Sequence, residues 1–409
     1  MARAAGHSQR GFAGLRQRVR ACWRYWRGDS VAVYGPEGEK EALLAQLGRR
    51  GLDGGEHIVR AHRYILLGDD SFDFYLQNRR KLENKAVYLK YSALPAQAVS
   101  SPSLRLFCPE EIASRLFWKE QNLYERSAAR SHRLNIVFLG FGCLGENLLT
   151  YGLLDNIFAP EQRIAYHIFG ADGGFAATHP QLGEIGDPVV FYGEPWYTQL
   201  PLLEEADMVL VLEQNDPLAL LQRLLLATIR PSFYVFAADS AGLDLLEGQK
   251  RLTVIPWLEQ AQTPEYIFSD SLYRRAKRIN LRYAHIYSGT EENEENMQAE
   301  WEKLDSFTRY SNISAADYHE MRLAMLASMG AAAADATADP ALLERLSELE
   351  HIRWCRYHYL NNWRRGVPEN GKNKDAAQRI HADLVAYAEL TDGEKEKDRE
   401  NIRVLMAID

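Results

Sequence analysis

The stretch Leu134–Leu139 (LNIVFL) is apolar at almost every position and runs directly into a glycine-rich turn. An uninterrupted apolar strand of this kind is typical of a parallel sheet whose two faces are both covered by helices. The turn contains Gly140, Gly142 and Gly145, and a helical pattern follows at 146–154. A strand, a tight glycine turn and a helix in this order predict an α/β fold built on parallel strands.

Further strand candidates follow this turn, and apolar helical stretches separate some of them. They are Ile164–Phe169, Val189–Tyr192, Met208–Leu212, Phe233–Ala237 and Leu252–Ile255. Together with Leu134–Leu139 they predict a complete Rossmann-like, doubly wound sheet.

The preceding part of the chain repeats this alternation in a weaker form. Its strand candidates are Val31–Tyr34, Tyr64–Leu67, Ala86–Tyr91 and Leu104–Cys108. The turn after the first strand is Gly35-Pro36-Glu37-Gly38, in which proline lacks one amide and glutamate adds negative charge. We expect a structural or dimerising role for this half rather than dinucleotide binding in the usual manner.

Strand patterns stop at Pro264, and helical periodicity dominates the rest of the chain. The predicted fold class is α/β, with two Rossmann-like doubly wound parallel-sheet domains, then an all-helical segment and a small, mainly α domain. The predicted boundaries are a basic leader helix at 1–28, a degenerate Rossmann-like domain at 29–130, a nucleotide-binding Rossmann domain at 131–262, a helical connector at 263–330, a linker at 331–340 and a C-terminal module at 341–409.

Charge is distributed unevenly along the 409 residues, whose net charge is −8. Residues 1–28 contain seven arginines and no acid, so the remaining chain is more acidic than the total suggests. An acidic body is a poor binder of phosphate backbones, and we expect no nucleic-acid partner. The basic leader is expected to pack on the following domain or to lie on an anionic membrane surface.

Four widely spaced cysteines, no apolar run of membrane-spanning length and no recognisable signal peptide favour a reducing, cytoplasmic location. The histidines show no metal-ligand spacing, and we expect no metal site. Motifs of phosphate-loop enzymes, zinc proteases and serine hydrolases are missing as well.

The glycine turn is the strongest chemical signal in the sequence. Its first glycine permits a tight turn, its second lets backbone amides approach a pyrophosphate, and its third lets the helix pack on the strand. Asp172 follows the second strand, where an acid would hold ribose hydroxyls or would serve only as a turn residue. The predicted cofactor-binding residues are Gly140, Phe141, Gly142, Cys143, Leu144, Gly145, Asp172, Glu213 and Asn215.

Leu67-Gly68-Asp69 in the first half and the Gly140–Gly145 turn in the second resemble tandem TrkA-N (RCK) domains. This resemblance implies binding of NAD or another adenine nucleotide as a ligand and regulation of potassium transport. Glu350-His351-x-x-Trp354, Asn362–Gly366, His381–Leu390 and Glu394–Asp398 resemble the RyR domain, the repeat named after ryanodine receptors and also found in bacterial proteins.

The RyR-like module offers aromatic residues beside cationic ones, which would suit stacking on an adenine and pairing with phosphate. The alternative is that the tryptophans and histidines are core residues. The predicted pocket comprises His351, Trp354, Trp363, Arg364, His381, Tyr387 and Lys397.

No sequence motif supplies a catalytic base, so we expect a non-catalytic nucleotide sensor rather than an enzyme. Its output would be control of potassium transport or of a defence response through the RyR-like module. We expect a dimer, with a membrane channel or another effector as partner. The alternatives are an NAD(P)-dependent oxidoreductase and a ligand-free interaction scaffold.

Overall fold

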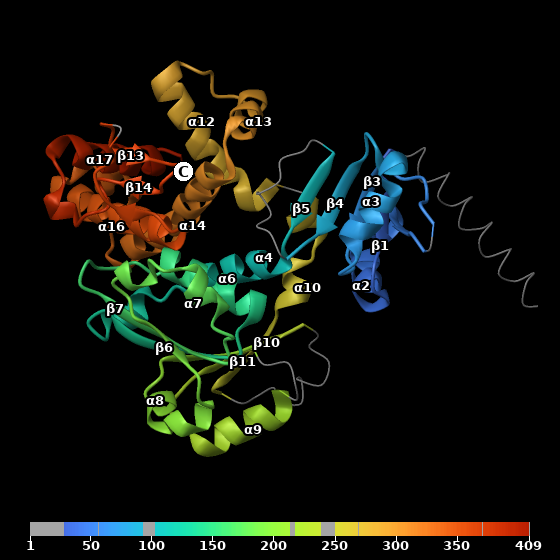
Figure 1. The fold of residues 1–409 in the computed structure, drawn as a ribbon, viewed down its shortest axis with the longest axis horizontal. Coiled ribbons are helices and arrows are strands. Elements are labelled where there is room, and N and C mark those ends of the chain that lie inside the picture. Colours follow the sequence, from blue (N-terminus) through green and yellow to red (C-terminus); the bar gives the residue numbers. More distant parts are fainter. Residues whose placement is uncertain are drawn as a thin grey trace, which may run out of the picture. The chain divides into compact units, whose positions relative to one another are not determined.

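The computed structural model describes residues 28–55, 57–92, 103–212, 217–238, 250–268, 270–369 and 371–408. The chain forms two compact units, which are described separately (Figure 1). The first comprises Met1–Ile112 with Glu259–Leu272, and the second comprises Ala113–Leu258 with Tyr273–Asp409. The basic leader expected at 1–28 lies outside the described residues, apart from Gly28.

The first unit contains a five-stranded parallel sheet in the order β2-β1-β3-β4-β5. Its strands are β1 (Val31–Tyr34), β2 (Gly51–Asp53), β3 (Arg63–Leu66), β4 (Ala86–Lys90) and β5 (Leu104–Phe107). Its helices include α2 (Glu37–Leu47), α3 (Ser71–Leu82) and α11 (Pro264–Phe268). Alternate residues of β1 enter two buried clusters: Ala32 and Tyr34 lie in one, and Val31 and Val33 in the other. Both faces of the sheet are therefore covered, as expected for parallel strands.

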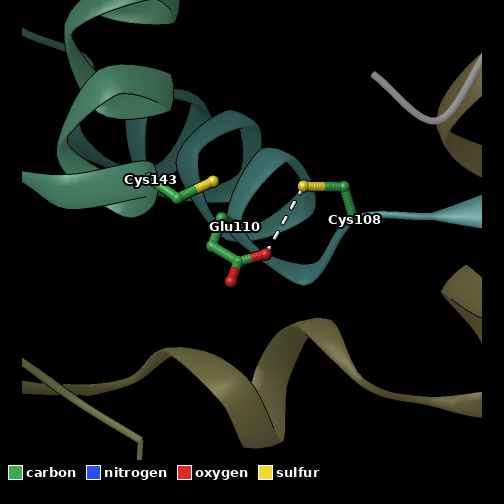
Figure 2. Close-up of side chains that lie close together, drawn as sticks. All are labelled: Cys108, Glu110 and Cys143. Atoms are coloured by element: carbon green, nitrogen blue, oxygen red, sulfur yellow. Dashed lines mark hydrogen bonds between the residues drawn. The ribbon is translucent and has the colours of Figure 1, made fainter. Parts of the chain in front are cut away.

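The first unit ends where β5 passes into α4 (Pro109–Gln121). In this connection the Cys108 thiol donates to Oε2 of Glu110 at 3.4 Å, and Figure 2 shows the two side chains directed at each other. Ser92 donates to the same oxygen at 2.8 Å. Glu110 therefore ties the loop after β4 to the first turn of α4.

The second unit contains a six-stranded parallel sheet in the order β11-β10-β9-β6-β7-β8. Its strands are β6 (Arg133–Leu139), β7 (Arg163–Phe169), β8 (Val189–Tyr192), β9 (Met208–Val211), β10 (Phe233–Ala237) and β11 (Leu252–Pro256). This order is that of a Rossmann sheet. The predicted α/β class with two doubly wound parallel sheets is confirmed.

Helices cover both faces of the second sheet (Figure 1). On one face lie α4 and α6 (Gly142–Asp155), where Tyr166 of β7 donates to the carbonyl of Gly152 at 2.8 Å. On the other face lie α8 (Leu200–Glu204) and α9 (Pro217–Ala227), whose buried leucines pack against Val137 and Val209. Short helices in the connections are α5 (Tyr124–Ala128), α7 (Gly174–Thr178) and α10 (Trp257–Ala261).

The C-terminal part of the second unit is mainly helical. Its helices are α12 (Arg274–Ser288), α13 (Glu294–Lys303), α14 (Ser306–Ser328), α15 (Ala333–Ala338), α16 (Pro340–Leu360) and α17 (Asp392–Met406). The residues 331–340 expected as a linker contain α15, whose Ala336 is fully buried. A small sheet of β12 (Arg364–Arg365), β13 (Lys374–Asp375) and β14 (Ile380–His381) lies between α16 and α17 in the chain, and the sequence pattern gave no sign of it.

Buried polar contacts join these C-terminal helices to the second sheet and its connections. Arg356 of α16 pairs with Asp187 at 2.7 Å and donates to the carbonyl of Leu153 at 2.9 Å. Tyr318 of α14 donates to the carbonyl of Ile157 at 2.7 Å. No helix among the described residues is both long enough and apolar enough to span a membrane.

Candidate functional site

The glycine turn joins the end of β6 to the start of α6. Gly140 donates its amide to the carbonyl of Phe169 at 3.0 Å and has a φ of 87°. Gly142, the first residue of α6, has a φ of 55°. Both values lie in the left-handed region, which glycine adopts without the penalty that a Cβ imposes. The turn thus needs glycine at these positions for its backbone path.

The second and third glycines face different surroundings. A Cβ added to Gly142 would meet no atom of the described residues within 4 Å. A Cβ added to Gly145 would lie 2.7 Å from Cδ2 of Phe141 and 3.2 Å from Cδ1 of Leu212. The third glycine therefore allows α6 to pack closely on the sheet. The second faces open space at the N-terminus of α6, where unpaired amides attract an anion.

The remaining residues of the predicted turn divide between core and surface. Phe141 and Leu144 are buried, and the Phe141 ring contacts those of Phe175 and Phe191 at 5.8 and 5.9 Å. Cys143, also labelled in Figure 2, is half-buried in the first turn of α6, and its carbonyl accepts a bond from Asn147 at 2.9 Å. Phe141 and Leu144 thus anchor the turn, and Gly142 between them is exposed.

The turn occupies the topological switch point of the second sheet. β6 pairs with β7 on one side and with β9 on the other, so the chain reverses its direction of winding at this strand. Ligands of open α/β sheets bind in the crevice at the carboxyl ends of the strands at this point. The predicted site residues Glu213 and Asn215 follow β9 and lie outside the described residues.

Asp172 lies between β7 and α7 and is exposed. Its Oδ1 accepts the amide of Gly174 at 2.8 Å, so it does perform the turn role that the sequence allowed. Glu146, in the first turn after Gly145, has its pKa raised by burial and further raised by the charge of Asp172. The two carboxylates give this side of the turn a negative potential. Sequence reasoning missed Glu146, although an acid directly after the third glycine was visible.

The structure brings five of the residues predicted for the RyR-like pocket into one network of ring contacts. Ring centroids lie 5.7 Å apart for His351 and Trp354, 5.9 Å for His351 and Tyr387, 4.8 Å for Trp354 and His381, and 6.3 Å for Trp363 and His381. The two cationic members differ from this group, because Arg364 is exposed on β12 and Lys397 is exposed and pairs with Glu394 at 3.0 Å.

The centre of this network is densely packed. Trp363 is buried with Cys355 and Leu384, and its ring lies 5.4 Å from that of Phe307. His358, which sequence reasoning did not single out, lies 5.2 Å from Trp363, and burial lowers its pKa to about 3. An apolar, close-packed environment of this kind fits the core interpretation of Trp363.

His351 is held at both ring nitrogens. Nδ1 lies 3.3 Å from Oδ2 of Asp398, and Nε2 lies 2.9 Å from the carbonyl oxygen of Val385. Both partners accept hydrogen bonds, and only an imidazolium can donate from both nitrogens. Burial by itself lowers the pKa of His351, but interactions with Asp398 and Cys355 outweigh it and raise that pKa to about 10.

Comparison with known proteins gives matches to solved structures and no family. No family model matches the chain, and no curated protein matches it. Among solved structures, a similar one is D-lactate dehydrogenase from Aquifex aeolicus, complexed with NAD and lactic acid. It is 11% identical, and the match covers 74% of this chain and 96% of that chain with a TM-score of 0.25.

That solved structure is an NAD-bound enzyme, so the expectation of a non-enzyme is corrected and is not carried further. A TM-score of 0.25 assigns no reaction to this chain. The Rossmann assignment rests on strand order and on the glycine turn.

Proposed function

We propose that the second unit binds an adenine dinucleotide, NAD or a close relative, at the carboxyl edge of its sheet. The observation that carries this proposal is Gly142, which combines a φ of 55° with open space where its side chain would be. At the first turn of α6, beside the switch point, that space is suited to a pyrophosphate held by backbone amides.

The residues beside the turn fit the rest of such a ligand. Asp172 keeps Oδ2 for a ribose hydroxyl while Oδ1 accepts from Gly174. The charge of Glu146 close to Asp172 disfavours an additional phosphate on that ribose. Phe175 is buried and its ring stacks on that of His179 at 4.0 Å, so it anchors α7 beside the turn rather than contacting the ligand. NAD therefore fits this side of the turn better than NADP.

The bound nucleotide could serve chemistry or regulation. An NAD(P)-dependent oxidoreductase would need a proton-transfer residue near the nicotinamide, after β9 and β10. The segments 213–216 and 239–249 follow these strands and lie outside the described residues. Hydride transfer thus remains open to direct measurement.

The regulatory form of the proposal rests on the resemblance to RCK and RyR domains. In it, the C-terminal helices report ligand occupancy to a membrane channel or transporter of potassium, or to a defence effector, in a dimeric protein. It is supported by contacts from the RyR-like part to the second sheet's connections, such as Arg356 with Asp187 and Asn362 with Thr178.

Calorimetry with NAD, NADH, NADP and ATP on the purified chain tests binding. We expect Gly142→Val to abolish dinucleotide binding while the circular dichroism spectrum stays unchanged, because the added side chain would occupy the pyrophosphate position. Gly289→Val is the matched control, since Gly289 also has a left-handed φ, of 70°, and a Cβ there also meets open space. Equal affinity in wild type and Gly142→Val would refute the site.

A second assay follows NADH absorbance with panels of alcohols, aldehydes and 2-hydroxy and 2-keto acids. Substrate-dependent turnover that disappears in Gly142→Val would establish the oxidoreductase form. Tight binding without turnover across the panels would favour the regulatory form.

A further inference from the structure

A hollow of about 600 Å³ lies at the amino ends of β6 and β7, at the opposite edge of the second sheet from the glycine turn. It is lined by Ala129, Arg130, Ser131, Arg133, Leu134, Asn135, Arg163 and Ala165. This volume falls within the range of small-molecule sites in proteins. The described residues that line it include three arginines and no acid.

One of these arginines is neutralised by a neighbouring aspartate. Nη1 of Arg130 pairs with Oδ1 of Asp207, whose other oxygen accepts the amide of Asn135 at 2.8 Å. Asp207 is thus committed to two partners at the rim of the hollow.

The other two arginines lie side by side without such a partner. Arg133 begins β6 and Arg163 begins β7, and the two are register partners in the parallel pair. Both are exposed, and neither forms an ion pair within the described part of the chain. Like charges at directly paired positions destabilise a sheet, so this arrangement carries a cost in the absence of an anion.

The surrounding backbone fixes the start of the strand that carries Arg133. The turn into β6 contains Ser131 and His132, with φ of 52° and 56°. It is fixed by the His132 amide, which donates to the carbonyl of Ser127 at 2.7 Å, and by a contact of 3.1 Å between Oγ of Ser127 and Nδ1 of His132. Arg133 is the next residue and the first of β6, so a short hydrogen-bonded turn rather than a long loop sets its backbone position.

Paired guanidinium groups match the geometry of phosphate oxygens, to which each can donate two parallel hydrogen bonds. The hollow exceeds the size of a single phosphate ion and leaves room for an organic group beside Leu134 and Ala165. We propose that the hollow formed by Arg130, Arg133 and Arg163 is a second ligand site, which binds a small phosphate ester.

This site is separate from the proposed dinucleotide site. β6 runs from Arg133 to Leu139, and at about 3.3 Å per residue its length places the two sites roughly 20 Å apart. Binding of a phosphate ester in this hollow does not require an intact glycine turn. Either of the two proposals can therefore be wrong while the other is right.

The test uses the full chain, with pyrophosphate and glucose 6-phosphate as probes and citrate at equal ionic strength as a non-phosphate anion. Calorimetry and thermal unfolding should show binding of the phosphate probes in wild type. Arg133→Gln combined with Arg163→Gln should weaken that binding at least tenfold. Arg223→Gln combined with Arg230→Gln removes the same charge elsewhere in the unit and should leave binding unchanged.

Two further measurements complete the test. Gly142→Val should retain pyrophosphate binding, which separates this hollow from the glycine turn. Without ligand, the Arg133/Arg163 double variant should melt no lower than wild type, because it loses a repulsion rather than a stabilising pair. Undiminished phosphate binding in the double variant, equal binding of citrate, or no probe binding to wild type would each overturn the proposal.

Discussion

Asn362 donates its side-chain amide to the carbonyl of Thr178 at 2.8 Å, a contact between residues 184 positions apart. Thr178 is the last residue of α7, the short helix whose first residue, Gly174, donates its amide to Asp172. Asn362 lies in the turn after α16, with a φ of 61°. The RyR-like part of the chain thus touches the helix adjoining the proposed ribose site.

We therefore predict that Asn362→Gly weakens dinucleotide binding by up to about tenfold, because one hydrogen bond that holds α7 contributes about 0.5–1.5 kcal/mol. Glycine retains the left-handed backbone, so the change removes the amide alone. Calorimetry against Asn361→Ala, whose side-chain amide donates to the carbonyl of Tyr357 in the preceding helix, is the matched comparison. Identical affinities in all three proteins would show that α7 does not need this contact for binding.

Replacing Asp172 tests its role toward ribose. Asp172→Asn should reduce the preference for NAD over NADP by about tenfold, equivalent to about 1.4 kcal/mol, because it removes a charge that repels a ribose phosphate. The amide oxygen can still accept from Gly174, so the turn should persist. Competition binding with both dinucleotides measures the ratio, with Glu146→Gln as a second variant. An unaltered ratio would mean that Asp172 is only a turn residue.

His351 predicts a pH dependence of stability. Its pKa is about 10 in the folded protein, against an ordinary value of 6.5. A raised pKa stabilises the fold fully below about pH 6.5, and this contribution is lost as the pH rises toward 10, with a maximal slope of about 1.4 kcal/mol per pH unit. The free energy of unfolding of wild type should therefore exceed that of His351→Gln by less and less as the pH rises through this window. Urea titrations at pH 6, 8 and 10 measure it, and a constant difference would contradict a protonated His351.

Asp187 accepts hydrogen bonds from Gln162 and from the amide of Ile164, each at 2.7 Å, besides its pair with Arg356. Asp187→Ala should destabilise the second unit by about 3–5 kcal/mol, because it leaves a buried guanidinium without its carboxylate. Glu205→Ala, which breaks an exposed pair with Arg230, should cost less than about 1 kcal/mol. Equal midpoints of denaturation for the two variants would refute this view of the buried pair.

The main sheets were predictable because apolar parallel strands leave a strong local signal. Phe233–Ala237 is wholly buried and was predicted with its observed bounds. β2 was not predicted, since Gly51–Asp53 is too short to show a period. The two-residue strands β12 and β14 are defined by their partners rather than by composition.

The candidate site was predictable to a similar degree. The glycine turn was visible because its residues are consecutive in the sequence. The proximity of the Glu146 and Asp172 carboxylates was not visible, because it depends on how the ends of β6 and β7 meet in the sheet. The hollow at Arg133 and Arg163 depends on strand register, which no local pattern reveals.

The bond from Arg356 to the carbonyl of Leu153 joins positions 203 residues apart. At translation rates of about 5–20 residues per second, a ribosome needs roughly 10–40 seconds to make the intervening chain. During this interval the carbonyl of Leu153 and the carboxylate of Asp187 exist without the guanidinium that later covers them. The second sheet therefore completes its buried contacts only after α16 has emerged, and a nascent chain that stalls earlier presents these groups to solvent or to a chaperone.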